Sequence, residues 1–88
     1  MGSYRVAFRP SAERELRKLP RTVIAEVSTL VGEFAESPYT RNSEKLSGGE
    51  NLFRVRIGDY RVVYQVDLKN RLITIFRVRH RKDVYRKF

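Results

Sequence analysis

The stretch NLFRVRIGDYRVVYQVD, residues 51–67, decides the fold, because it places two runs of alternating apolar and polar residues on either side of a glycine. Alternation with a period of two predicts β-strands, here over about 52–57 and 60–66. The dipeptide Gly58-Asp59 between them is typical of a two-residue hairpin turn. The sequence therefore predicts an antiparallel hairpin at this point of the chain.

The register of this hairpin would separate the two kinds of residue onto opposite faces. One face is apolar and consists of Phe53, Val55, Ile57, Tyr60, Val62 and Tyr64. The other carries Arg54, Arg56 and Arg61 together with Val63. Arg56 would stand directly opposite Arg61, and like charges in that position destabilise a sheet by about 0.2–1 kcal/mol. An anion bound between the two arginines would remove the conflict, so this face is a candidate anion site.

The segment before the hairpin predicts one strand and two helices. Residues 4–8 alternate and form the strand, which Pro10 ends. The period then changes to that of a helix, which Pro20 stops, and a second helix is capped by Thr22 and ends at Pro38. The apolar stripe of the second helix comprises Val23, Val27, Leu30, Val31 and Phe34. The charged residues of the first helix are interpreted as a solvated face: Glu13, Glu15, Arg17 and Lys18.

The segment after the hairpin predicts a last strand over 72–79, whereas residues 38–51 are interpreted as a loop. We expect an α+β fold, with an N-terminal strand, an antiparallel two-helix hairpin and then a three-stranded antiparallel meander. The helices pack on one face of a four-stranded sheet, and the other face stays open. No repeat or linker interrupts the chain, so residues 1–88 are expected to form a single domain.

Composition limits the classes of function. Nineteen Lys and Arg residues against ten Asp and Glu give a net charge of +9, which favours a polyanionic partner: nucleic acid first, then an acidic protein, then a membrane surface. The absence of cysteine excludes disulfides and thiolate zinc sites, and one histidine with scattered carboxylates gives no support for a metal or other cofactor. No apolar run is long enough to span a membrane or to form a signal peptide, so we expect a soluble, cytoplasmic protein.

The last strand adds further arginines. Arg77, Arg79 and Arg81 share one parity, and the other parity carries Phe76, Val78 and His80. If the arginine parity joins the face of Arg61, that face carries an array of guanidinium groups, which bind phosphate in a bidentate manner. The alternative is that these arginines are solvated charges that protect an exposed strand.

Two stretches, SEKLSGGENLFRVRIGDYRVVYQVD at 43–67 and RVRHRKDVYRKF at 77–88, resemble the RelE toxins of the RelE/ParE superfamily, found in bacterial and archaeal toxin–antitoxin pairs. The most specific pieces are Lys45-Leu46, the strand YRVVY at 60–64 and the ending His-Arg-x-x-x-Tyr at 80–85. The resemblance covers nearly the whole chain. It implies an endoribonuclease that cuts messenger RNA in the ribosomal A site and is held in check by a cognate antitoxin, RelB-like or of another family.

Metal-free RNA cleavage needs three things: a group that accepts the proton of the 2′-hydroxyl, stabilisation of the phosphorane and a proton for the leaving 5′-oxygen. Arginine is a poor proton carrier and suits only the stabilising role, for which we predict Arg61 and Arg81. The resemblance assigns Arg54 and Arg56 to the RNA backbone and gives Tyr85 an orienting or proton-relay role. The predicted RNA-binding set is completed by Lys45, Arg77 and Arg79.

The general base is left open between three residues. The best-known RelE toxins offer lysine as a possible base, but both matching positions here are arginine. His80 is the single histidine of the chain, and histidine has an ordinary pKa of about 6.5 that suits proton transfer. Other relatives pair a C-terminal histidine with a glutamate just before the Lys-Leu dipeptide, which is Glu44 here. Tyr85 is the third candidate.

Two other functions compete with RNA cleavage. A ParE-like toxin would inhibit DNA gyrase by protein binding, although such relatives generally lack the C-terminal set His80, Arg81 and Tyr85. An inactive domain would use its basic face only for an antitoxin. In each case we expect the antitoxin to contribute an acidic or amphipathic segment that is disordered alone and wraps the toxin.

Overall fold

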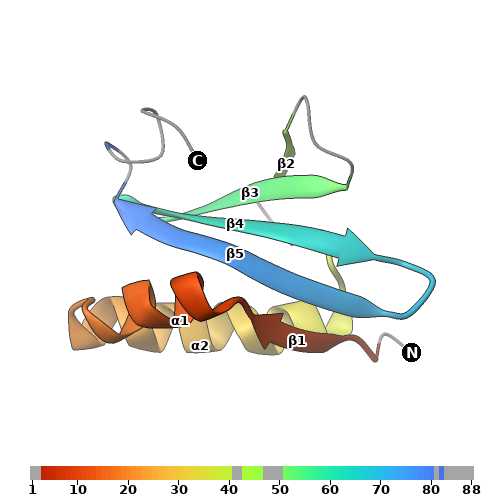
Figure 1. The fold of residues 1–88 in the computed structure, drawn as a ribbon, viewed down its shortest axis with the longest axis horizontal. Helices are drawn as coiled ribbons and strands as arrows, with labels where there is room; N and C mark the ends of the chain where they lie inside the picture. The colour runs from red at the N-terminus through yellow and green to blue at the C-terminus, as the bar shows by residue number, and fades with distance from the viewer. Residues whose placement is uncertain (1–2, 41–42, 47–50, 81, 83–88) are drawn as a thin grey trace.

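Two helices cover one face of a β-sheet in the computed structural model of the chain (Figure 1). The structure describes residues 3–40, 43–46, 51–80 and 82. In chain order, the elements are β1 (Arg5–Phe8), α1 (Pro10–Arg17), α2 (Arg21–Glu36), β2 (Glu44–Lys45), β3 (Leu52–Ile57), β4 (Tyr60–Asp67) and β5 (Leu72–His80). Among these residues the sheet has five strands in the order β1-β5-β4-β3-β2.

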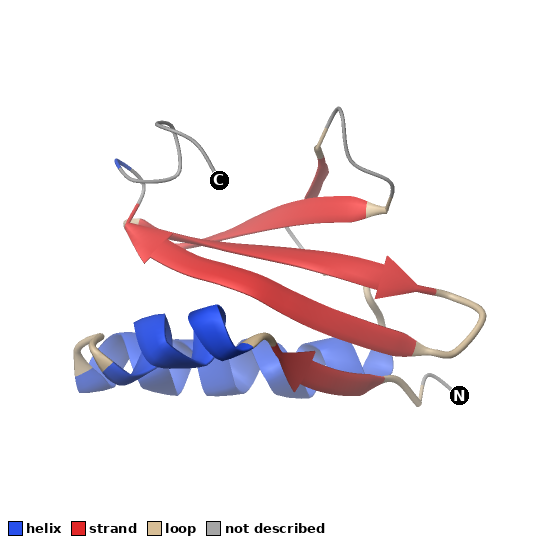
Figure 2. Ribbon diagram, viewed as in Figure 1, coloured by secondary structure: helices blue, strands red, loops and turns tan. Residues whose placement is uncertain are grey.

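The α+β class is confirmed, and the helices lie together on one side of the sheet (Figure 2). The predicted number of strands is wrong, because β2 was interpreted as loop. Glu44 pairs with Arg54, and Lys45 pairs with Phe53, which extends the antiparallel part of the sheet beyond β3. A two-residue strand has no alternation that a sequence pattern can detect, and it forms here on the edge that β3 offers. At the opposite edge β1 pairs with β5 in parallel.

The register of the central hairpin is confirmed. Ile57 pairs with Tyr60 and Arg56 with Arg61 on either side of the turn, and Gly58 has the positive φ of 57° that the tight turn requires. Where β4 pairs with β5, the register shifts between Val63 and Tyr64, which face Arg77 and Ile75. Phe76 is left as an extra residue, as in a β-bulge. The bulge reverses the parity of β5, so that both Ile75 and Val78 point to the core.

The helix boundaries follow the prolines of the sequence. Pro10 occupies the first position of α1, where its fixed φ suits a helix start. α2 begins at Arg21 immediately after Pro20, and Thr22 lies within the helix without a capping hydrogen bond. The prediction that Thr22 caps this helix is therefore wrong, because the short link between α1 and α2 lets the helix begin as soon as Pro20 has passed.

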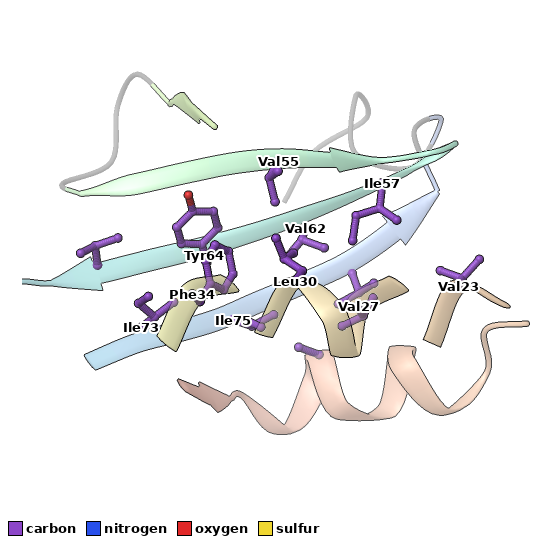
Figure 3. Close-up of a cluster of buried hydrophobic side chains, with 13 residues drawn as sticks. Val23, Val27, Leu30, Phe34, Val55, Ile57, Val62, Tyr64, Ile73 and Ile75 are labelled. Atoms are coloured by element: carbon purple, nitrogen blue, oxygen red, sulfur yellow. The ribbon is translucent and has the colours of Figure 1, made fainter. Parts of the chain in front are cut away.

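The core lies between α2 and the apolar face of the sheet (Figure 3). The buried residues of α2 are Val23, Val27, Leu30 and Phe34. Phe34 packs against Tyr64 with ring centroids 4.4 Å apart, and the hydroxyl of Tyr64 donates a 2.8 Å hydrogen bond to the carbonyl of Pro38. Tyr64 is thus a core residue that also fastens the loop after α2. No helix among the described residues is long and apolar enough to cross a membrane.

Candidate functional site

Five arginines lie on the face of the sheet opposite the helices, which we call the arginine face: Arg54, Arg56, Arg61, Arg77 and Arg79. The strand register arranges them in two rows across β3, β4 and β5. One row is Arg56, Arg61 and Arg79, and the other has Val63 between Arg54 and Arg77. The bulge in β5 is what brings Arg77 and Arg79 to the parity of this face. The strand register and this bulge together place the five arginines on one face, which regular alternation along β5 would not have done.

The centre of the arginine face is more buried than the sequence suggested. Arg61 is 8% exposed and Val63 is 1% exposed, so the expectation of a fully open face is wrong at this point. Val63 is flanked by Arg54 and Arg77, whose side chains are 24% and 32% exposed. Long arginine side chains cover apolar surface with their methylene groups, which is consistent with this burial.

Arg61 retains most of its hydrogen-bonding capacity. Among the described residues its guanidinium makes one hydrogen bond, from Nη1 to the carbonyl of Tyr60 at 3.4 Å. A guanidinium has five N–H donors. Arg61 therefore lies in the middle of an arginine row, largely buried, with donors available to an anion.

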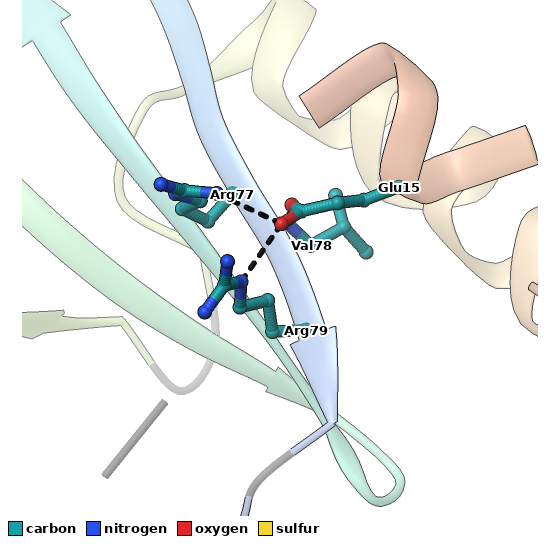
Figure 4. Close-up of polar contacts among 4 residues, drawn as sticks. All are labelled: Glu15, Arg77, Val78 and Arg79. Carbon is teal, nitrogen blue, oxygen red and sulfur yellow. Dashed lines mark hydrogen bonds and ion pairs between the residues drawn. The ribbon is translucent and has the colours of Figure 1, made fainter. Parts of the chain in front are cut away.

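A carboxylate from helix α1 holds the edge of this site (Figure 4). Oε1 of Glu15 accepts a 2.9 Å bond from the backbone N–H of Val78, and Oε2 accepts bonds from Arg79 Nε at 2.7 Å and Arg77 Nη1 at 3.0 Å. Burial raises the pKa of Glu15, but the hydrogen bonds from Arg79, Val78 and Arg77 outweigh it and leave the pKa below its ordinary value.

The interpretation of Glu15 as part of a solvated face is therefore wrong. β1 pairs with β5 as far as Ile75, so within the described residues the outer edge of β5 beyond that point has no strand neighbour. Glu15 satisfies the N–H of Val78 on this edge. No local signal in the sequence could have shown this contact, because Glu15 and Val78 are 63 residues apart.

Glu44 lies at the other side of the arginine face, on β2. Its Oε1 accepts a 2.7 Å bond from Arg54 Nη2, and its side chain is 65% exposed. That hydrogen bond, together with the positive charge of Arg54, lowers the pKa of Glu44. Lys45 is opposite Phe53 and so has the parity of the helix side, away from the arginine face. Within the described ranges, no three His, Cys, Asp or Glu side chains gather closely enough to hold a metal ion.

His80 is not brought to the arginine face. It pairs with Tyr60, on the parity of the core, and its ring meets that of Tyr60 edge-on at 5.4 Å. Its Nδ1 accepts a 3.3 Å bond from the N–H of Lys82, and the residue lines an open pocket of about 490 Å³ between α1 and the end of β5. The two other predicted site residues of the C-terminal segment, Arg81 and Tyr85, lie outside the described residues.

Comparison with known proteins identifies the class. A family model for the ParE toxin of the type II toxin–antitoxin system parDE matches residues 6–85. The fold and this match define the chain as a toxin of a type II toxin–antitoxin system.

Individual relatives show which branch of this toxin family the chain is similar to. Toxin RelG from Mycobacterium tuberculosis is 33% identical over 85 residues, which are 96% of this chain and 98% of that toxin. The crystal structure of the toxin–antitoxin complex RelBE2 from the same organism matches with a TM-score of 0.77 and 32% identity, over 89% of this chain and 98% of that one. The intact RelBE complex from E. coli gives a TM-score of 0.78 and 30% identity, over 89% and 96%. The chain belongs to the RelE toxins of the RelE/ParE superfamily.

Proposed function

We propose that this toxin is an endoribonuclease that cuts messenger RNA in the ribosomal A site, without a metal and with the 2′-hydroxyl of the RNA as nucleophile. The observation that carries the proposal is the row of Arg56, Arg61 and Arg79 across three neighbouring strands. Glu15 neutralises Arg79 at one end of the row, but Arg56 and Arg61 stand directly opposite each other, and among the described residues no carboxylate is bonded to either of them. A phosphate lying over the row would supply the missing negative charge.

The roles of the arginines follow from their positions. Arg61 lies at the centre, with donors that no other described residue occupies, and stabilises the phosphorane, the task for which a permanently charged guanidinium is suited. Arg81 is proposed to share this task. Arg56 and Arg54, on β3, bind the phosphates of neighbouring nucleotides, and Arg77 and Arg79 on β5 continue the same track. Lys45 has the opposite parity and contributes by its charge alone.

The site has few side chains that are suited to proton transfer. Of the two candidate bases that the structure describes, Glu44 lies beside the arginine face, and its lowered pKa makes it a carboxylate at neutral pH but a weak base. His80 would have to act from the other side of the strand end. Tyr85 keeps its proposed orienting or relay role. A site so poor in proton carriers is expected to cut free RNA slowly and to depend on the ribosome to position the message.

We also propose a cognate antitoxin, RelB-like or of another family, as the protein partner in a hetero-oligomer. The solved relatives above are complexes of toxin with antitoxin. A net charge of +9 with five arginines on one face favours an acidic or amphipathic segment that covers this face.

The test is a reconstituted translation reaction in which the toxin is added and the 3′ ends of the message are mapped. We expect cuts at fixed positions within codons for the natural toxin. Arg61→Ala should slow cutting at least about 100-fold, as loss of a transition-state donor does in other enzymes, and Arg81→Ala should act in the same direction. Arg17→Ala, which removes the same charge from an exposed position of α1, is the matched control and should cut normally.

Three results are distinguishable. Codon-positioned cuts support the proposal, whereas DNA gyrase poisoning without cuts would assign the toxin to the ParE-like alternative. Neither activity would leave antitoxin binding as the role of the arginine face. Normal cutting by both Arg61→Ala and Arg81→Ala would overturn the assignment of the site.

A further inference from the structure

Glu15 binds the two arginines through different nitrogen atoms. Oε2 receives Nε of Arg79 and Nη1 of Arg77, while Oε1 is occupied by the backbone of Val78. The hydrogen bond from Arg79 to Glu15 is made by Nε, as Figure 4 shows, and neither terminal nitrogen of Arg79 is bonded to another described residue. Arg79 in turn stands directly opposite Arg61 in the sheet.

We propose that Glu15 is a positioning residue for the cleavage proposed above: it holds Arg79 through Nε, so that the two terminal amino groups are presented beside Arg61. This inference rests on the proposed function. The carboxylate is well placed for the task, because its other oxygen is anchored on the backbone of the strand that carries Arg79. The helix, the strand edge and the guanidinium are thereby fixed relative to one another.

The physical reason for such a residue lies in the behaviour of unrestrained arginines. Arg77 and Arg79 are two positions apart on one strand and would repel each other without the carboxylate that both contact. Arginine side chains also have many rotamers, and ordering them during the reaction costs entropy. A guanidinium already held in place meets the transition state without that cost.

Loss of the Glu15 carboxylate should have opposite effects on RNA affinity and on the rate of cutting, which makes the inference testable. Removing the carboxylate makes the arginine face one charge more positive, which by itself strengthens RNA binding. The freed Arg79 still attracts the RNA by its charge but no longer holds the phosphate in the reacting position beside Arg61, which slows the chemical step. We therefore expect Glu15→Gln to bind an uncleavable RNA as tightly as the natural toxin or up to several-fold tighter, and yet to cut at least tenfold more slowly at saturating ribosomes.

Glu13→Gln is the matched control, because it removes the same charge from the same helix at a residue that is 58% exposed and paired only with Arg17 among the described residues. We expect it to cut within twofold of the natural toxin. Equal cutting rates for Glu15→Gln and Glu13→Gln would overturn the inference. A parallel loss of RNA affinity and cutting rate in Glu15→Gln would do the same, since it would point to a general loss of structure.

A second measurement keeps the inference separate from the proposed reaction. The Nε–H of Arg79 in the free toxin, observed by ¹⁵N NMR, should be protected from solvent exchange in the natural protein and in Glu13→Gln. It should exchange faster in Glu15→Gln. If the natural toxin fails to cut on ribosomes but this difference is found, the proposed function falls while the arrangement of Arg79 stands. An unchanged Nε–H signal in Glu15→Gln would overturn the positioning role itself.

Discussion

Two carboxylates flank the arginine face, and their environments suit them to different tasks. Glu15 is 20% exposed and accepts three hydrogen bonds from described residues, two of them from arginines. Glu44 is 65% exposed and, within the same part of the chain, accepts one, from Arg54. An exposed ion pair contributes little to stability and rearranges easily, so Glu44 can release Arg54 to a phosphate. Glu15 is the fixed member of the pair.

Protonation of Glu15 should weaken the fold. Its pKa in the folded protein is lowered, because hydrogen bonds from Arg79, Val78 and Arg77 outweigh the opposing effect of burial. A lowered pKa contributes stability above the unfolded-state value of about 4.3, and this contribution is lost as the pH falls through the folded value. We therefore expect Glu15→Gln to be less stable than the natural protein at pH 7, with the difference shrinking towards pH 3.

Urea denaturation of both proteins at several pH values measures this difference directly. Glu44 and Asp67 also have lowered pKa values, but they are present in both proteins and cancel in the comparison. A gap between the two proteins that stays constant from pH 7 to pH 3 would show that the charge of Glu15 is not what stabilises the strand edge.

At the scale of the elements, the parts predicted correctly are those whose own residues determine them. The strands on either side of Gly58 alternate regularly, and a two-residue turn leaves one register that buries the apolar parity. This also predicted the position of Arg61 in the candidate site. The parts that were missed depend on partners far along the chain: β2 needs the edge of β3, and the contact of Glu15 needs the edge of β5.

The candidate site shows the same division. Parity along β5 predicted that Arg77 and Arg79 lie on the face opposite to that of His80, but it left open which face this is, and the bulge at Phe76 decides it. Lys45 was predicted to contact RNA, but its parity in β2 follows from a pairing that the sequence does not show.

The hairpin turn can be tested by substitution of its glycine. Gly58 has a φ of 57°, and a Cβ at this position would meet no atom within 4 Å, so alanine would introduce backbone strain without a packing clash. We expect Gly58→Ala to lower the free energy of unfolding by about 1–2 kcal/mol.

Gly32 in α2 also has open space around it, and Gly32→Ala should instead stabilise the protein by about 0.5–1 kcal/mol. Chemical denaturation of both variants measures the contrast, and a Gly58→Ala protein as stable as the natural one would contradict the turn geometry.

At the scale of the whole molecule, the two faces of the sheet serve different purposes: one forms the hydrophobic core and the other displays the positive charge. One face meets α2 and provides the core, so most of the apolar side chains of β3, β4 and β5 are used there. The other face is left to the arginines, whose arrangement follows from the same strand register. The positive charge is thus displayed on the surface of the sheet, which under the proposed function favours a fixed array of phosphate contacts over a diffuse attraction.

The contrast between fixed phosphate contacts and diffuse attraction by net charge predicts how salt affects RNA binding. Each phosphate neutralised on a single strand contributes about −0.7 to the slope of log affinity against log salt concentration. Arg56→Ala should make the slope shallower by about that amount, because it removes one member of the arginine row. Arg17→Ala lowers the net charge equally but lies on α1, so its slope should match that of the natural toxin. Fluorescence anisotropy with a short 2′-O-methyl RNA, titrated at several salt concentrations, measures all three slopes. Equal changes in the two variants would mean that net charge, and not the row on the sheet, determines RNA binding.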